Sequence, residues 1–398
     1  MKRKLVQLVI LVVLLSLVTG CWNRRELNVL GIAVGIGIDK VGKLYQVTAQ
    51  VVDPGEVAAK KGAGGRTAVT VYRAVGTSIS EALRKMTTES PRQIYSAHLR
   101  VLVLGESLAR EGIGKALDYL SRGHEFRTDF FIVVAKGTTA ENTLKVLTIL
   151  EDIPSVKMWA ALNTSEKVWA PTVSITLDEL MSDLVSEGKN PALAGIEVRG
   201  NQQTGESKTN LEAPDPGARL RYSGIAMFKK DKLVGWLNED ESKGFTNITD
   251  RLDSTITQVA CPKGGILGID VIRSKTNVQG RVVRGQPKVE VFIRTEANIG
   301  NVECEIDLTK SKTIYQLESK VEKAMKENTE AAIKKAKKLK TDIFGFGEDV
   351  RRGNPAAWKT LKKNWDEAFI NLPVSIKIDV KIRRLGTVSN SFLKEMQK

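Results

Sequence analysis

Cys21 is the residue of this chain whose type and surroundings point most directly to chemistry. A basic start (residues 1–4) and an apolar run (residues 5–18) precede it, and the two residues immediately before it are small. These three features together make a secretory signal. Lipidation uses the thiol of the residue that becomes the new N-terminus. A Cys at this point therefore predicts a bacterial lipoprotein signal peptide over residues 1–20.

We expect the mature protein to begin at Cys21, to carry acyl chains such as palmitate there, and to lie on the extracytoplasmic face of a membrane. The alternative is an uncleaved N-terminal anchor. The apolar run is shorter than the roughly 20 residues that a comfortable membrane span needs. An uncleaved segment would also leave the rest of the chain on the same outer face.

Two further cysteines, Cys261 and Cys304, follow in the C-terminal half. In an oxidising compartment they can form a disulfide. Buried free thiols that pack as small hydrophobic side chains are an equally good interpretation. The two residues show no local spacing motif for zinc.

The two histidines, His98 and His124, are the remaining candidates for metal or acid–base chemistry. Neither has a metal-ligand partner at i+4 or a Cys at useful spacing, so we expect no zinc site. The sequence contains no Gly-x-Ser-x-Gly elbow and no phosphate-binding Walker loop. Because no nucleophile, base and metal can be assembled, we expect a protein that is not an enzyme and that holds no cofactor.

Three glycines, Gly31, Gly35 and Gly37, superficially suggest a dinucleotide-binding loop. Such a loop requires a helix directly after it, whereas the sequence here predicts a second strand. We therefore expect these glycines to allow close backbone packing.

Acidic and aromatic clusters have ordinary structural interpretations. Glu239, Asp240 and Glu241 lie on a predicted exposed turn, where a solvated acidic cluster is expected. Trp358 and Trp365 are spaced on one helical stripe with apolar neighbours, so we expect core packing rather than a ligand platform.

The chain carries a net charge of +15, and 42% of its residues are hydrophobic. About 378 residues remain after the predicted cleavage, enough for two or three domains. Nucleic acid is a poor partner because the chain is exported and lacks a recognition motif. An anionic membrane surface fits better, since each basic residue near such a surface contributes about 1 kcal/mol. A solvated basic face that aids solubility is the alternative.

The first half of the sequence alternates strand and helix patterns. Strand patterns cover residues 30–39, 44–52, 68–75, 99–104 and 130–135, and helical patterns cover residues 78–86, 139–150, 156–168 and 177–185. This alternation predicts an α/β domain over residues 21–200. Residues 201–219 are polar and contain Gly and Pro, which is typical of a linker or a long loop.

The second half predicts a middle domain (220–285) and a C-terminal domain (286–398). In the latter we expect strands near 288–297 and 374–382, a long helix near 313–340 and a second helix from Pro355. The C-terminal domain should be an antiparallel sheet covered by two helices. The whole chain is expected to have a multi-domain α+β (mixed α/β) fold, with antiparallel and mixed sheets and flanking helices.

Several segments in order resemble one known family. They are CWNRREL (21–27), LGIAVGIGIDK (30–40), SAHLRVLVLGESLAREGI (96–113), GIAMFKKDKLVGWLNEDESKGF (224–245), and the stretch from TDIFGFG (341–347) to IRRLG (382–386). Together they resemble the Ger(x)C family, the lipoprotein C subunits of nutrient germinant receptors in endospore-forming bacteria. Cys-Trp followed by Arg-Glu-Leu after the predicted signal is the most specific of these motifs.

The resemblance implies a protein attached through Cys21 to the outer face of the inner spore membrane, in complex with two polytopic membrane subunits, A and B. The complex converts nutrient binding into germination. Family members have three mixed α/β domains, are not enzymes and hold no known cofactor. Nutrient recognition is usually assigned to the B subunit, so the resemblance implies a scaffold or signal-relay role. Cys21 is the one functional residue carried over by position.

Two other classes compete with this interpretation. A solute-binding lipoprotein of a transporter would have two similar α/β lobes around a cleft, and a cell-wall hydrolase would need catalytic residues that the sequence lacks. Two segments are candidate partner surfaces on charge and pattern: the basic helix around Lys334–Lys340 and the strand edge at Val374–Arg384.

Overall fold

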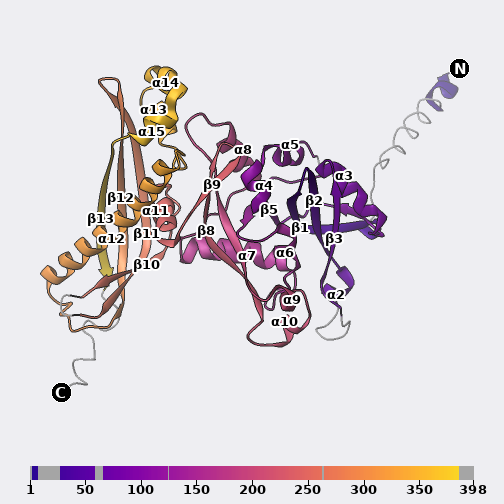
Figure 1. Ribbon diagram of the computed structural model, residues 1–398, viewed down its shortest axis with the longest axis horizontal. Helices are drawn as coiled ribbons and strands as arrows, with labels where there is room; N and C mark the ends of the chain where they lie inside the picture. The colour runs from indigo at the N-terminus through magenta and orange to yellow at the C-terminus, as the bar shows by residue number, and fades with distance from the viewer. Residues whose placement is uncertain (1, 8–26, 59–65, 124, 262–263, 385–398) are drawn as a thin grey trace.

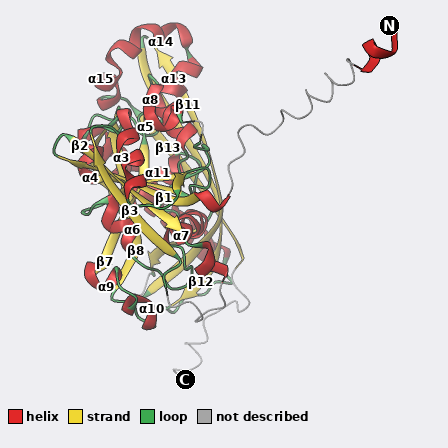
Figure 2. Ribbon diagram, turned by 90° about the vertical axis from the view of Figure 1, so that its right-hand side faces the viewer, coloured by secondary structure: helices red, strands yellow, loops and turns green. Residues whose placement is uncertain are grey.

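Two β-sheets organise the chain in the computed structural model, which describes residues 2–7, 27–58, 66–123, 125–261 and 264–384. Figure 1 shows the nine-stranded sheet on the right and the four-stranded sheet on the left. We call residues 27–237 the first module and residues 238–384 the second module. Figure 2 views the molecule from the side of the first module, with α14 at the top and α10 at the bottom.

The first module contains nine of the described strands. They are β1 (Leu30–Val41), β2 (Leu44–Val52), β3 (Val69–Gly76), β4 (Gln93–Tyr95), β5 (Val101–Gly105), β6 (Phe131–Ala135), β7 (Ala192–Gly200), β8 (Ala218–Lys229) and β9 (Lys232–Leu237). Its helices are η1 (Leu27–Val29), α2 (Pro54–Ala58), α3 (Ile79–Lys85), η2 (Met86–Thr88), α4 (Glu106–Glu111), α5 (Gly114–Arg122), α6 (Ala140–Lys145), α7 (Pro154–Val168), α8 (Leu177–Val185), α9 (Gln202–Gly205) and α10 (Thr209–Glu212).

The centre of the first sheet is parallel and its margins are antiparallel. The order is β3-β2-β1-β5-β6-β7-β8-β9, with β4 beside β1, and the pairs β1/β5, β5/β6 and β6/β7 are parallel. Helices α6 and α7 pack with Val101 and Val133 on one face, whereas α4, α5 and α8 pack with Leu102 and Leu104 on the other. Burial on both faces explains why β5 and β6 are continuous apolar runs.

The predicted strands at 30–39 and 44–52 and the helix predicted from residue 78 are confirmed. β1 and β2 pair antiparallel across the turn at Gly42, and the Ser78 side chain caps α3 by accepting a hydrogen bond from Glu81 N–H. The predicted connection 201–219 contains α9 and α10, and the strands on its two sides, β7 and β8, pair in one sheet. Sheet pairing continues to the end of β9, while the division into domains at 201–219 stays a prediction.

The second module contains four described strands and a helical layer. Its strands are β10 (Thr255–Ala260), β11 (Ile266–Val283), β12 (Gln286–Val302) and β13 (Val374–Arg384). Its helices are α11 (Glu239–Ile248), α12 (Ser311–Lys338), α13 (Phe346–Gly353), α14 (Pro355–Leu361), η3 (Lys362–Asn364) and α15 (Trp365–Ile370). The sheet order is β10-β11-β12-β13.

The multi-domain α+β fold is confirmed, with one correction to the C-terminal sheet. That sheet is mixed rather than antiparallel, because β13 pairs parallel with β12. The chain between these strands runs through α12, α13, α14 and α15. A crossover of this length brings the chain back in the same direction, which a tight hairpin cannot do.

The long helix α12 lies along β13. The carboxylate of Glu322 accepts a hydrogen bond from Val380 N–H at 3.1 Å, and that of Glu318 accepts one from Ile382 N–H at 3.0 Å. These side chains therefore cover part of the free edge of β13. Covering an edge is a common protection against unwanted strand pairing.

The expected core role of the aromatic stripe is confirmed. Trp358 and Trp365 are 3% and 4% exposed, and Phe369 is fully buried. The predicted single helix is divided into α14, η3 and α15. One hydrophobic core runs without interruption from the first module into the second, so the two modules form a single packed unit.

Of the two alternatives for Cys261 and Cys304, the structure shows the disulfide. Cys261 and Cys304 are bonded, with their Cα atoms 6.4 Å apart. The bond ties the end of β10 to the segment after β12.

Candidate functional site: the joint between the modules

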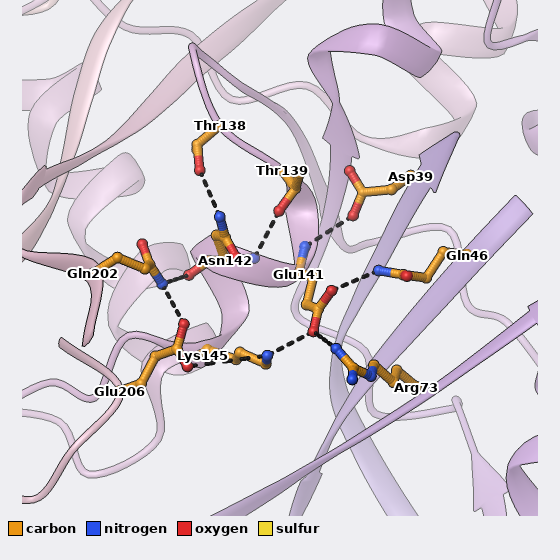
Figure 3. Close-up of polar contacts among 10 residues, drawn as sticks. All are labelled: Asp39, Gln46, Arg73, Thr138, Thr139, Glu141, Asn142, Lys145, Gln202 and Glu206. Atoms are coloured by element: carbon orange, nitrogen blue, oxygen red, sulfur yellow. Dashed lines mark hydrogen bonds and ion pairs between the residues drawn. The ribbon is translucent and has the colours of Figure 1, made fainter. Parts of the chain in front are cut away.

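The polar cluster drawn in Figure 3 lies between the end of β1 and the start of α6, and its contacts are structural. Asp39 is buried, and its carboxylate accepts hydrogen bonds from Ala140 N–H at 2.8 Å and Glu141 N–H at 3.0 Å. Burial raises the pKa of Asp39 above its usual value. The contacts hold the start of α6 against the sheet.

Glu141 is the centre of the same cluster and is fully engaged. Its carboxylate accepts hydrogen bonds from Gln46 at 2.7 Å and Arg73 at 2.6 Å and pairs with Lys145 at 2.6 Å. Burial favours a higher pKa for Glu141, but the hydrogen bonds with Lys145, Arg73 and Gln46 hold the pKa below its usual value. Because these partners occupy it, the cluster joins β2, β3 and α6 rather than offering an acid or base to a substrate.

Asp342 organises the loop that joins the two modules. Its side chain is 1% exposed. Oδ1 accepts hydrogen bonds from the N–H groups of Phe344, Gly345 and Phe346 at 3.0–3.2 Å. Oδ2 accepts from Gly347 N–H at 2.9 Å and from the indole N–H of Trp365 at 3.0 Å. A single carboxylate thus fixes the turn 341–347 and anchors α15 to it.

Burial raises the pKa of Asp342 to about 6, against the opposing effect of these hydrogen bonds. The carboxyl group therefore titrates near neutral pH while it remains enclosed in the protein.

The same loop docks onto the first module through backbone contacts. Asn190 N–H donates to the carbonyl oxygen of Asp342 at 2.7 Å, and the Thr341 hydroxyl donates to the carbonyl oxygen of Phe228. Gly188 and Gly347 meet backbone to backbone, since a Cβ added to Gly188 would lie 2.6 Å from the carbonyl carbon of Gly347. Only a residue without a side chain fits at this contact.

Polar side chains extend the joint on its outside. Lys362 pairs with Glu187 at 2.9 Å and Lys229 pairs with Asp366 at 2.7 Å. The Ser186 hydroxyl donates to Glu348 at 2.6 Å. With the continuous core, these contacts make the joint a rigid connection rather than a hinge.

A polar cleft of about 770 Å³ lies beside the joint, between α8, α11 and α13. Its charged side chains satisfy one another: Lys189 pairs with Asp183 at 2.8 Å, and Arg351 pairs with Glu348 at 2.5 Å. Burial raises the pKa of Asp183. Small-molecule sites are usually apolar with a few convergent polar groups that are free to bind, and this cleft lacks that character.

The structure places the remaining sequence candidates as follows. Gly35 and Gly37 allow close packing as expected, because a Cβ on Gly37 would lie 3.0 Å from Ala140 and Leu144. Glu241 forms a capping box with Asn238 at the start of α11, so the predicted acidic turn is a helix N-terminus. His98 is exposed and its ring contacts Tyr95.

Cys21 and His124 lie outside the described residues, so the lipidation of Cys21 stays a prediction. Over the described ranges, no group of three or more His, Cys, Asp or Glu side chains is arranged to hold a metal ion. No helix in the described part of the chain has the length and apolar character of a membrane span.

The two predicted partner surfaces are partly used within the chain. The ammonium group of Lys337 donates to the carbonyl oxygen of Leu372 at 2.6 Å, and Glu318 and Glu322 occupy part of the edge of β13. Sequence reasoning missed Asp342 and Gly188. An Asp followed by a Gly-rich turn is a signal for the first, whereas no local pattern marks the second.

The fold and the joint together define a class: a two-module α+β protein whose modules are joined through a loop that a buried carboxylate organises. Two family models match this chain. "Spore germination protein N-terminal domain" matches residues 23–198, and "Spore germination B3/ GerAC like, C-terminal" matches residues 223–386. The chain therefore belongs to the Ger(x)C family of spore germination proteins, as its sequence motifs indicated.

Individual relatives agree with this assignment. The chain is 33% identical to spore germination protein KC of Bacillus subtilis (strain 168) over 398 residues, covering 98% of each chain. It is 23% identical to spore germination protein B3 of the same organism over 93% of this chain and 95% of that protein. The crystal structure of the GerBC protein has a similar fold, with a TM-score of 0.52 and 20% identity over 87% of this chain and 96% of that one.

Proposed function

We propose that this chain is the lipid-anchored C subunit of a germinant receptor complex, required for nutrient-triggered spore germination. In this role it acts as a scaffold or signal relay with two membrane subunits, A and B. Its relatives are named as spore germination proteins. A germinant receptor is the setting in which such a subunit would act.

The rigid joint around Asp342 is the observation that carries the relay role. A protein that passes a conformational signal between partners needs a stiff body, because packed elements with discrete arrangements transmit displacement. The joint couples β8, the 186–190 segment and α13 through Asp342, Thr341 and Gly347. Displacement of one module therefore moves the other.

The rigid joint between the modules argues against a solute-binding lipoprotein of a transporter. Proteins of that class close two lobes around a ligand by hinge motion. Here the core is continuous between the modules, and the charges of the cleft between them are paired. Scaffolding therefore fits this chain better than solute capture.

Membrane attachment is proposed through acylated Cys21. Residues 1–20 have the features of a lipoprotein signal, and Cys21 would be the mature N-terminus on the outer face of the inner spore membrane. The basic end of α12, which includes Lys334 and Lys338, is proposed as an auxiliary contact with anionic lipid. Each basic residue near such a surface adds about 1 kcal/mol of attraction.

Spores in which Cys21→Ala replaces the native residue test this function. We expect the protein to leave the inner-membrane fraction and nutrient-triggered germination to fail, while a trigger that bypasses nutrient receptors still works. The exposed substitution Gln203→Ala in α9, which keeps Cys21, is the control and should stay in the membrane fraction. A normal nutrient response from Cys21→Ala spores that have no redundant receptor would contradict the proposal.

A further inference from the structure

The second module carries more net positive charge than the first module. The second module, residues 238–384, contains 28 Lys and Arg against 21 Asp and Glu, a net charge of +7, whereas the first module, residues 27–237, has a net charge of +3. A charge of this size affects association with partners rather than the fold. The second module is therefore the part of the molecule that attracts an anionic partner most strongly.

One face of the second sheet carries much of this charge. We define the outer face as the fifteen alternate residues of β11 (273–281), β12 (288–296) and β13 (375–383) that point away from the core. Directly paired residues of neighbouring strands share a face. The fifteen positions contain eight basic and three acidic side chains. Six of the basic residues are Arg273, Lys275, Arg294, Lys377, Lys381 and Arg383.

The helices of the second module cover the opposite face. Gly280, an inner-face residue, meets the backbone of α13 at Asp349. The inner-face residue Val380 is fully buried, in the same core as Leu317 and Val321 of α12. The side chains of Lys275 and Arg294 are 78% and 80% exposed. Over the part of the sheet that the structure describes, the outer face is therefore solvated.

The three carboxylates do not neutralise the outer face. Glu296 accepts from Arg383 at 2.7 Å, Asp379 pairs with Lys381 at 3.0 Å, and Glu290 pairs with Lys288 at 3.1 Å. Asp250, which lies outside the face, pairs with Lys275. Among the described residues, Arg273 and Lys377 have no carboxylate within ion-pair distance. The Lys377 ammonium instead lies 5.4 Å from the ring centre of Phe292, beside a shallow depression of about 400 Å³ in the outer face.

The outer face points away from the end of the molecule where the membrane anchor is proposed. α11 contacts β8 and β9, and α13 begins at the Gly188–Gly347 contact, so the inner face is turned toward the first module. Figure 1 shows the second sheet at one end of the molecule and the first module at the other. Cys21 is only six residues from Leu27, a reach of about 20 Å when extended. A membrane at that end lies nearer to the first module than to the outer face (Figure 1).

A second copy of the chain is also a poor partner for the outer face, because the outer face of that copy would carry the same net positive charge.

We propose that the outer face docks an acidic, extracytoplasmic surface of another protein in the same assembly, an inference that rests on the proposed function. Three strands about 4.8 Å apart and about 30 Å long give a patch of roughly 450 Å². This is less than the ~800 Å² that each partner contributes to a standard interface, so the contact is auxiliary and sensitive to salt.

Photocrosslinking in spores tests this inference. A photoreactive amino acid replaces Asn277, an uncharged residue within the outer face, and a control places it at exposed Gln203 in α9. We expect Asn277 to crosslink to a protein segment of net negative charge, identified by mass spectrometry. The double reversal Arg273→Glu/Lys377→Glu should lower the yield at least fivefold. Lys115→Glu/Lys208→Glu, which changes the net charge equally on the first module, should leave it unchanged.

The other outcomes overturn the inference. They are a crosslink to lipid, a crosslink unaffected by reversal, or none above the Gln203 control. Binding of the purified mature chain to phosphatidylglycerol vesicles that is lost in the Arg273→Glu/Lys377→Glu variant would identify lipid as the ligand instead. Co-purification with membrane subunits, measured on the same spores, distinguishes failure of the docking surface from failure of the proposed function. If the complex persists without the crosslink, only the docking surface is refuted.

Discussion

Gly188 and Gly347 touch across the joint so closely that a Cβ on either would lie 2.6 Å from backbone atoms of the other. The contact joins the segment after α8 to the start of α13, far apart in sequence. Backbone atoms cannot move aside as a flexible side chain can, so the contact fixes how the modules meet. A single methyl group added at either glycine would therefore disturb the packing of the joint.

Gly188→Ala should destabilise the protein by about 1–3 kcal/mol, the range for inserting an atom into a well-packed region. Thermal unfolding of the purified mature chain measures the change. Gly55→Ala is the control, because Gly55 is exposed in α2 and its Cβ would meet only a side-chain oxygen of Asp53, at 3.3 Å. Equal melting temperatures for Gly188→Ala and wild type would contradict the close contact.

The fold was largely predictable where the pattern is local. Alternation in residues 374–382 predicted β13, and the spacing of Trp358 and Trp365 predicted their burial. The direction of β13 was not predictable, because it depends on where a long helical crossover returns the chain. The pairing of Cys261 and Cys304 could not be predicted, because a disulfide depends on the distance between two residues in space and their spacing in the sequence does not give that distance.

The joint was less predictable than the strands. Asp342 accepts hydrogen bonds from backbone N–H groups only a few residues away, and the Gly-rich sequence after it suggests such a local turn. Its indole partner, Trp365, comes from α15 and could not be predicted in this way. Gly188 is defined by a contact that only the tertiary structure creates. Long-range backbone approach leaves no periodic trace in a sequence.

Asp342 should make stability depend on pH near neutrality. Its pKa rises from 3.8 to about 6 on folding, so the folded state holds the proton more tightly than the unfolded state. The stabilisation is complete below about pH 4 and is lost as the pH rises through about 6. The loss is on the order of 3 kcal/mol.

Asp342→Asn should abolish this dependence, because an amide does not titrate. The variant should also be less stable at every pH, since its NH₂ group faces N–H donors of the loop. Denaturant unfolding from pH 4 to 7.5 on both proteins measures the difference in slope. Parallel pH profiles would show that Asp342 does not titrate in this range.

Trp365→Phe and Trp358→Phe should differ although both remove a buried indole. Trp365 donates to Asp342 at 3.0 Å, whereas the indole N–H of Trp358 is buried without a hydrogen-bond partner in the described structure. Trp365→Phe removes one hydrogen-bond donor from the buried Asp342 carboxylate. It should therefore lower the free energy of unfolding by about 1–3 kcal/mol more than Trp358→Phe does. Both variants lose the same ring volume, so their difference in unfolding free energy isolates the hydrogen bond.

Removal of the disulfide should lower stability mainly through the unfolded chain. Cys261 and Cys304 are separated by 43 residues, and closing a loop of this size is worth about 4 kcal/mol in the chain-entropy model. Cys261→Ser/Cys304→Ser should therefore unfold at lower denaturant concentration than the oxidised protein. An unchanged midpoint, or a wild-type midpoint insensitive to reductant, would argue against the bond.

Co-purification tests whether this chain belongs to a receptor complex. The tagged full-length chain is isolated from detergent-solubilised spore membranes, and its partners are identified by mass spectrometry and quantified. We expect two polytopic membrane proteins in stoichiometric amounts, and we expect both to be lost together with membrane attachment in the Cys21→Ala variant. Recovery of transporter subunits in their place, or of the chain alone under conditions that preserve other receptor complexes, would contradict membership of a receptor complex.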